Sequence, residues 1–256
     1  MFEPLHTDNT SNLMELLIES WDTCEQDPRL PKTEPIAKSS EDQKSTTDNP
    51  FWDIIRWLPS VRDGYKPKLS PDFLPTSWGK EQLKKFIDAG LGRSSLSKTY
   101  AWSIPTPGDL TWITQILDGR AVVEVGAGTG YWAWQLEQCG IDVAAYDPNP
   151  VDEDNRYCSG GPYTTVLRQD ASAAAHHPDR ALLLVWPPYD DPAAAHALAS
   201  YSGDLLIYAG EGDGGCTGDD TFHELLGREW EEIGYSADHV TWWGIHCNLV
   251  AYRRKP

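Results

Sequence analysis

The sequence predicts an α/β fold: a doubly wound sheet of seven mostly parallel strands, with a helical extension at the N-terminus. Short apolar runs alternate with amphipathic stretches along the C-terminal part of the chain, which is the pattern of repeated strand–helix units. One apolar run, residues 121–125, leads into three glycines at alternate positions, Gly126, Gly128 and Gly130, and then into a helical stretch. These features predict a buried strand, a tight turn and a crossover helix.

Residues 1–50 are expected to be an appendage of this core. Residues 13–21 (LMELLIESW) predict one short amphipathic helix. The stretch after it is rich in Pro, Ser, Thr, Lys and Glu, and such a composition cannot bury enough apolar surface to become ordered alone. We therefore expect residues 1–50 to be poorly ordered, apart from that helix.

Residues 51–99 predict a small helical cap. An apolar helix over residues 51–58 is ended by Pro59, and residues 64–75 form an irregular connector with interleaved prolines and lysines. Residues 78–89 then predict a second helix, because apolar side chains recur at helical spacing before Gly90. Two roles stay open: the cap covers a ligand pocket, or it packs against one face of the sheet.

The third segment, residues 100–256, begins with the glycine turn at its centre. A helix over residues 107–117 precedes the strand at 121–125, a helix over 131–139 follows, and the next strand, residues 141–147, ends in Asp147. A P-loop needs Lys followed by Ser or Thr after its last glycine, whereas a dinucleotide fingerprint needs glycine at position 131. Tyr131 and Trp132 stand there instead, which excludes both motifs.

The remaining elements continue the alternation. Strands are expected over residues 164–167, 181–185 and 204–209, with an alanine-rich helix over 192–200 between the last two. Thr221 and Glu224 form a capping-box pattern that opens a helix reaching residue 233. The closing strands, residues 239–243 and 247–252, are expected to form a hairpin around a turn at 244–246.

The pattern Glu-x-Gly-x-Gly-x-Gly resembles the first motif of class I S-adenosylmethionine (SAM)-dependent methyltransferases, and the resemblance covers residues 100–253. It implies a seven-stranded sheet with an antiparallel last strand. The Asp147 carboxylate would accept hydrogen bonds from both ribose hydroxyls, as the corresponding acidic residue does in dinucleotide folds. Asp170 would accept a hydrogen bond from the adenine amino group. The resemblance further implies that the cofactor contacts Glu124, Gly126, Ala127, Gly128, Gly130 and Tyr131.

A second motif follows the strand at 181–185. Trp186, Pro187, Pro188 and Tyr189 resemble the (Asp/Asn)-Pro-Pro-(Tyr/Phe) motif of methyltransferases that act on amino groups. The resemblance places them at the substrate, with Trp186 also beside the cofactor. Tryptophan has one donor and no acceptor, so it cannot hold an amine hydrogen as Asp or Asn does.

Two aromatic residues upstream of the glycine turn, Tyr100 and Trp102, are expected near the sulfonium, because a cation favours an aromatic face. Core packing is the alternative for both.

Candidates for catalysis come from the loops after the later strands. His246 is the first choice of general base because its pKa lies nearest neutrality, and Glu211 is the second. Both are expected to face the same pocket as Tyr189, which is the third catalytic candidate, although His246 or Glu211 could serve only as a hydrogen-bond partner. Glu211 and Asp213 lack a matched histidine, so no metal site is predicted.

The predicted function is methyl transfer from SAM to a nitrogen or oxygen of a small molecule. The net charge of −18 repels phosphate backbones and predicts no nucleic-acid partner. No apolar run approaches the roughly 20 residues of a membrane span, and no signal peptide is evident, which predicts a cytoplasmic or nuclear protein without a membrane partner. Two alternatives stay open: SAM chemistry without methyl transfer (aminocarboxypropyl transfer or cyclisation), and a non-catalytic SAM-binding or partner-binding module. The oligomeric state is also open.

Overall fold

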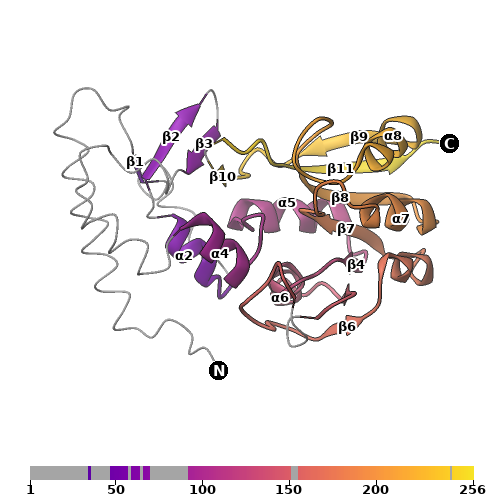
Figure 1. The fold of residues 1–256 in the computed structure, drawn as a ribbon, viewed down its shortest axis with the longest axis horizontal. Helices are drawn as coiled ribbons and strands as arrows, with labels where there is room; N and C mark the ends of the chain where they lie inside the picture. Colours follow the sequence, from indigo (N-terminus) through magenta and orange to yellow (C-terminus); the bar gives the residue numbers. More distant parts are fainter. Residues whose placement is uncertain are drawn as a thin grey trace.

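The computed structural model describes residues 34–35, 47–56, 59–63, 66–69, 92–150, 155–242 and 244–256 (Figure 1). The helices expected over residues 13–21 and 78–89 lie outside these ranges. No described helix has the length and apolar character that crossing a lipid bilayer requires.

A seven-stranded sheet forms the centre of the fold. Its strand order is β6-β5-β4-β7-β8-β11-β9, and β11 runs antiparallel to both of its neighbours while the other pairs are parallel. This confirms the predicted seven-stranded, mostly parallel sheet with its antiparallel last strand. The strands are β4 (Val122–Val125), β5 (Val143–Asp147), β6 (Val166–Arg168), β7 (Ala181–Val185), β8 (Leu205–Gly210), β9 (Trp230–Tyr235) and β11 (Asn248–Arg254).

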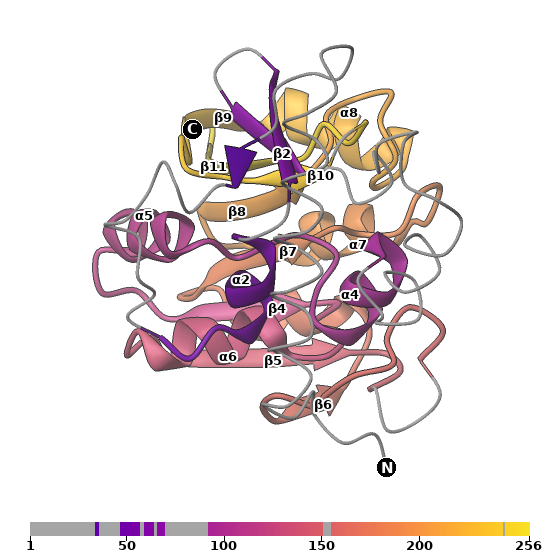
Figure 2. The same cartoon turned by 90° about the vertical axis from the view of Figure 1, so that its left-hand side faces the viewer.

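Helices cover both faces of this sheet, as Figure 2 shows. Alternate residues of a strand point to opposite faces, so Val122 packs with α5 (Pro107–Leu117) and α6 (Tyr131–Gln138). Val123 packs on the other face, against α7 (Ala193–Ser200), α8 (Asp220–Glu229) and the 3-10 helix η3 (Ala171–His176). Both faces are therefore buried, which explains why β7 (ALLLV) and β8 (LLIYAG) carry no charged residue.

The N-terminal part packs against the start of α6. Phe51 and Trp52 of α2 (Pro50–Ile55) share a buried cluster with Tyr131 and with Tyr100, which follows α4 (Arg93–Thr99). Asn49 caps α2 by accepting the Trp52 N–H at 3.0 Å. The helix expected over residues 51–58 is confirmed as far as residue 55.

A second, four-stranded sheet was not predicted. It has the order β1 (Glu34–Pro35), β2 (Pro59–Asp63), β3 (Lys66–Leu69) and β10 (Thr241–Trp242). The expected helical cap therefore contains a hairpin, and β3 begins inside the expected irregular connector. Its partner β10 comes from the far end of the chain, and local patterns carry no signal of such a pairing.

The C-terminal elements differ from prediction at their boundaries. α8 ends at Glu229, and β9 begins at Trp230, where a helix was expected to reach residue 233. β9, and not the stretch 239–243, is the sixth strand of the main sheet, so residues 236–247 form an insertion that carries β10. Pairing with β11 decides this, because tertiary contacts override local helix propensity. Asp219, not Thr221, caps α8 by accepting the Phe222 N–H.

Candidate functional site

The glycine turn joins β4 to α6 and leaves bare backbone beside a cavity. Gly126 has φ +76°, and a Cβ built there would meet no atom within 4 Å. Gly130 has φ +73°, and its Cβ would lie 2.9 Å from Val166 Cγ2, so this glycine is required by packing. The N–H groups of Gly126 and Ala127 both donate to the carbonyl of Tyr146. A ligand at this turn therefore meets bare Cα surface, because both of these N–H groups already have a partner.

Asp147 closes the neighbouring strand β5 and is 6% exposed. Its carboxylate accepts the N–H of Gly128 at 2.9 Å and that of Asn149 at 2.8 Å. Burial raises the pKa of Asp147, and these two N–H groups offset part of the effect. The carboxylate oxygens keep further lone pairs for a ligand's hydroxyls.

Glu124 lies in the middle of the sheet at the floor of the cavity. It is 1% exposed, and its Oε2 has no hydrogen-bond partner in the part of the chain that the structure describes. Burial raises the pKa of Glu124 to about 8, although the Ala133 N–H lowers it in part. A buried carboxyl oxygen without a partner is costly, so this position fits a ligand that brings a cation or a donor.

A cavity of about 1290 Å³ opens above these groups. Typical small-molecule pockets measure about 300–1,000 Å³, so this one has room for two ligands side by side. Its lining brings together all but one of the residues predicted to hold the cofactor or the substrate; Gly130 is the exception. The predicted residues in the lining are Tyr100, Trp102, Glu124, Gly126, Ala127, Gly128, Tyr131, Asp147, Asp170, Trp186, Pro187, Pro188 and Tyr189.

Two of the predicted aromatic residues are anchored in the protein core. Tyr100 is 6% exposed and stacks on Phe51, with ring centroids 5.0 Å apart. The Tyr131 hydroxyl donates to Asn49 at 2.8 Å and accepts the Phe51 N–H at 3.0 Å. Both residues still line the cavity. Most of the surroundings of Tyr100 therefore belong to the protein core, as the alternative of core packing expects.

The rim motif sits at the carboxyl end of β7, as expected. Tyr189 is 69% exposed, and Trp186 adopts φ +47°, a left-handed conformation that is uncommon for a bulky residue. The Pro187 carbonyl accepts the Gly218 N–H at 3.2 Å. This carbonyl is thus already engaged with the loop that follows β8.

The two candidates for a general base are not among the described residues that line the cavity, although Glu211 contacts Cys216, which is one of them. Glu211 is 4% exposed, and its carboxylate accepts the N–H of Cys216 at 2.7 Å and that of His246 at 2.6 Å. His246 is exposed, and neither residue belongs to the described lining of the cavity. Glu211 ties two loops together, and its role as a base stays a prediction, as does that of His246.

Sequence reasoning missed the loop that follows Asp147. Asn155, Arg156, Tyr157 and Cys158 line the cavity. The Tyr157 carbonyl accepts Trp102 Nε1–H at 3.0 Å, which joins this loop to the segment before α5. Proximity to Asp147 in the sequence was the one available signal, because the loop has no periodic pattern.

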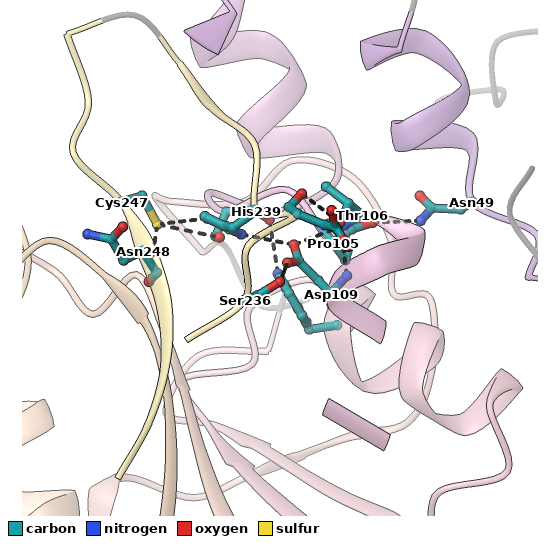
Figure 3. Close-up of polar contacts among 11 residues, drawn as sticks. Asn49, Pro105, Thr106, Asp109, Ser236, His239, Cys247 and Asn248 are labelled. Atoms are coloured by element: carbon teal, nitrogen blue, oxygen red, sulfur yellow. Dashed lines mark hydrogen bonds and ion pairs between the residues drawn. The ribbon is translucent and has the colours of Figure 1, made fainter. Parts of the chain in front are cut away.

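A buried polar network fixes the start of α5 (Figure 3). Asp109 accepts from Ser236 Oγ at 2.6 Å and pairs with His239 Nδ1 at 2.9 Å. His239 Nε2 lies 3.4 Å from Cys247 Sγ. These contacts join α5 to the insertion that carries β10.

Comparisons with known proteins point to methyltransferases. No protein-family model matches the chain. Curated relatives called ribosomal RNA large subunit methyltransferase M occur in Marinobacter nauticus (38% identical over 60 residues, 23% of this chain and 16% of the relative) and in Chromohalobacter salexigens (33% over 69 residues, 27% and 19%). The chain thus spans less than a fifth of the length of these relatives.

Solved structures give a fainter likeness. The magnesium protoporphyrin IX methyltransferase of Synechocystis with bound SAM is 13% identical, with a TM-score of 0.36 over 57% of this chain and 76% of that one. The 1,6-didemethyltoxoflavin-N1-methyltransferase of Burkholderia thailandensis is 18% identical, with a TM-score of 0.39 over 78% and 100%. At these TM-scores the likeness carries no information about substrate or mechanism.

The curated relatives overturn one expectation. The net charge of −18 was taken to exclude nucleic acid, yet the matching relatives are named for ribosomal RNA. Net charge describes the whole chain, whereas contact with a nucleic acid depends on the local arrangement of cations. The exclusion is therefore wrong.

Proposed function

We propose that this protein is a SAM-dependent methyltransferase whose acceptor presents a planar ring. The observation that carries the proposal is the unpartnered, buried Oε2 of Glu124 at the floor of the cavity, beside the bare turn at Gly126. An ammonium group bound there would complete the hydrogen bonding of Glu124, and the Asp147 carboxylate would accept ribose hydroxyls. The names of the curated relatives agree with this activity.

The adenosyl part would lie between the glycine turn and the loop over residues 155–158. Asn155 and Cys158 line the cavity on the loop side, and Asp170 with Ser172 lines it near the end of β6. Asp170 already accepts the Ser172 N–H at 3.0 Å, which holds its carboxylate at the entrance of η3. This carboxylate is the proposed partner of the adenine amino group.

The acceptor would occupy the side of the cavity lined by Trp102, Trp186 and Tyr189. Aromatic side chains stack readily on flat rings, and both a nucleobase of RNA and a free heteroaromatic molecule have such a ring. An amine target would find few hydrogen-bond acceptors here, because the Trp186 side chain has none and the Pro187 carbonyl already accepts the Gly218 N–H. A ring nitrogen or an oxygen fits the rim better.

SAM, when bound, supplies a methyl group that its sulfonium already activates. The protein's task is then mainly to align the acceptor and to exclude water. The rim at Trp186–Tyr189 and the loop at 155–158 are placed to do this. His246 and Glu211, which lie outside the described lining, would serve as bases only after moving toward the cavity.

Calorimetric titration with SAM tests binding, and incubation with methyl-labelled SAM tests transfer to either bulk RNA or a small-molecule extract. Label in one fraction, with S-adenosylhomocysteine as by-product, supports the proposal and identifies the source of the ring. Methylthioadenosine as by-product would instead indicate aminocarboxypropyl chemistry. Binding without turnover would indicate a binding module, and no binding of SAM by folded protein would refute the proposal.

A further inference from the structure

The aromatic residues on the acceptor side of the cavity offer no carboxylate and no imidazole. These residues are Trp102, Trp186 and Tyr189. A ring nitrogen or an oxygen that carries a hydrogen must lose that proton when it is methylated, and a base beside it helps the reaction. Because Glu211 and His246 are not in the described lining, a base from this chain has to be sought among the other lining residues.

Asp191 lies two residues beyond Tyr189 and lines the cavity, whereas its neighbour Asp190 is outside the described lining. Its Oδ1 accepts the N–H of Ala193, at the start of α7, at 2.9 Å. Among the described residues, its Oδ2 has no hydrogen-bond partner, and a carboxylate oxygen can accept two hydrogen bonds. The carboxylate is therefore held by one oxygen and can accept a ligand's hydrogen with the other.

The backbone that carries Asp191 is fixed on both sides. On one side, Gly218 donates its N–H to the Pro187 carbonyl at 3.2 Å, and its own carbonyl accepts the Asp190 N–H at 3.0 Å. On the other side α7 begins, and this helix is anchored in the core by buried residues such as Leu198. Asp191 thus keeps its position relative to the aromatic rim, and a fixed position is what an aligned reaction requires.

The other acidic and imidazole groups of the described lining lie toward the proposed cofactor. Three lining carboxylates are proposed partners of SAM: Glu124, Asp147 and Asp170. His196 also lines the cavity; the Ser172 hydrogen bonds lower the pKa of Asp170, and the nearby His196 adds to this effect. His196 is therefore placed beside Asp170, at the entrance of η3. Asp191 is the remaining carboxylate of the described lining.

We propose that Asp191 is a catalytic residue whose Oδ2 accepts the hydrogen of a ring N–H or an O–H on the acceptor. This inference rests on the proposed function and narrows its substrate to acceptors whose nucleophile carries a hydrogen. The proton passes to Oδ2 and then to water. The electron pair of the broken N–H or O–H bond stays on the acceptor atom and forms its bond to the methyl carbon, with S-adenosylhomocysteine as the leaving group. Asp191 thereby supplies the hydrogen-bond acceptor that Trp186 lacks at the first position of the rim motif.

Probes that differ by one methyl group test the proposal on full-length protein saturated with S-adenosylhomocysteine. In calorimetry, 2-naphthol is compared with 2-methoxynaphthalene, and benzimidazole with 1-methylbenzimidazole. We expect at least one probe with the hydrogen to bind about tenfold more tightly than its methylated partner, as a hydrogen bond to a carboxylate should. A preference within the first pair indicates an O–H acceptor, and a preference within the second indicates a ring N–H.

Variants separate this hydrogen bond from the bulk of the added methyl group. D191N keeps the shape of the side chain, and with its oxygen on the Ala193 N–H its amide nitrogen would face the acceptor. D191A removes both oxygens, and D191N serves if D191A does not fold. Each should reduce the preference to about twofold and leave the affinity for S-adenosylhomocysteine within about twofold. D190N is the matched control and should behave as wild type, because Asp190 is exposed and Asn tolerates its φ of +54°.

The transfer of label from methyl-labelled SAM to bulk RNA or to a small-molecule extract gives a second readout. D191N should lower the labelling about a hundredfold, the scale of losing a general base, and D190N should leave it unchanged.

Several results would overturn the proposal: equal affinity within both pairs, no binding of either hydrogen-bearing probe at millimolar concentration, a preference that survives substitution of Asp191, or an equal loss in D190N. A parallel loss of S-adenosylhomocysteine affinity in D191N would also overturn it, because the carboxylate would then serve the cofactor. If wild type does not bind S-adenosylhomocysteine, the proposed function fails separately, and the same pairs still test Asp191 on the ligand-free protein.

Discussion

At the scale of the residue, Glu124 is a buried carboxyl in the central strand β4, and its Oε2 has no hydrogen-bond partner among the described residues. Its neighbours in the sheet are Ala145 and Leu183, which offer its side chain no polar partner. Burial raises its pKa to about 8, so the carboxyl is mostly protonated at neutral pH in the free protein. A bound ammonium favours the ionised form, and binding must therefore release a proton below this pH.

The affinity for SAM should consequently depend on pH. Between pH 6 and 8 we expect the affinity of the wild type to rise, by at most about tenfold per pH unit, and to level off above about pH 8. Glu124→Gln should bind more weakly with a flat profile over this range. Calorimetry at several pH values provides the measurement. A wild-type profile as flat as that of the variant would mean that Glu124 does not meet the ammonium group.

Asp147 should matter more for the cofactor than Asp170 does. Asp147→Ala is expected to weaken SAM binding by about 2 kcal/mol, because it removes charge-assisted hydrogen bonds in a buried site. Asp170→Ala removes an exposed carboxylate for which water competes, so the loss should be several-fold smaller. Titration of both variants checks the order. Equal losses would place the ribose elsewhere.

At the scale of the element, substitutions at the glycine turn have two distinct effects. A strained backbone lowers the stability of the fold, and a side chain in the cavity lowers the affinity for SAM. Gly126→Ala adds a methyl group in open space at φ +76°, so we expect only about 1 kcal/mol of destabilisation from the left-handed backbone. SAM affinity should fall by far more, because the methyl group occupies the cofactor's place. Gly119→Ala is the matched control, since Gly119 has φ +82°, equally open space and no place in the described lining. Similar affinities in the two variants would argue against a cofactor at this turn.

The start of α5 depends on a charged pair. Burial alone would lower the pKa of His239, but the Asp109 carboxylate and the Cys247 sulfur outweigh it and raise the pKa to about 10. The unfolded value is near 6.5, so the stabilisation is complete below about pH 6.5 and is lost as pH rises through about 10.

His239→Gln should therefore lower the free energy of unfolding by about 3 kcal/mol at pH 6.5, as the loss of one partner of a buried pair does. The difference in the free energy of unfolding between the wild type and the variant should decrease steadily toward pH 10. Urea unfolding at pH 6.5, 8 and 9.5 measures it. A gap that does not change with pH would mean that His239 is neutral in the folded protein.

At the scale of the whole molecule, the N-terminal helix α2 supports the cavity from behind. Phe51 is fully buried between Tyr100 and Tyr131, which both line the cavity. Phe51→Ala should cost about 3–5 kcal/mol of stability and also weaken SAM binding. Leu117→Ala, at the far end of α5, should destabilise by a comparable amount without that loss. Thermal unfolding and titration of both variants with SAM would test whether α2 supports the cavity. An unchanged SAM affinity in Phe51→Ala would show that it does not.

The sequence by itself determined every strand of the main sheet except β9, and it determined the side of the cavity formed by the glycine turn and Asp147. The apolar runs, the glycine turn and Asp147 are local signals: periodicity marks each strand and helix, and parallel strands bring their carboxyl ends to one edge. For the same reason Trp186 to Tyr189 could be placed at that edge from the end of β7 alone.

Only the tertiary structure decided the rest. The second sheet joins β3 to β10, the Asp109–His239–Cys247 network joins α5 to the far end of the chain, and Arg93 meets Trp186 across a long stretch of sequence. The position of His246 outside the described lining follows from the insertion that carries β10. The local pattern of one segment holds no information about a partner that is distant in the sequence. The energies of pairing and packing decide such contacts, and they are gained only when the chain folds.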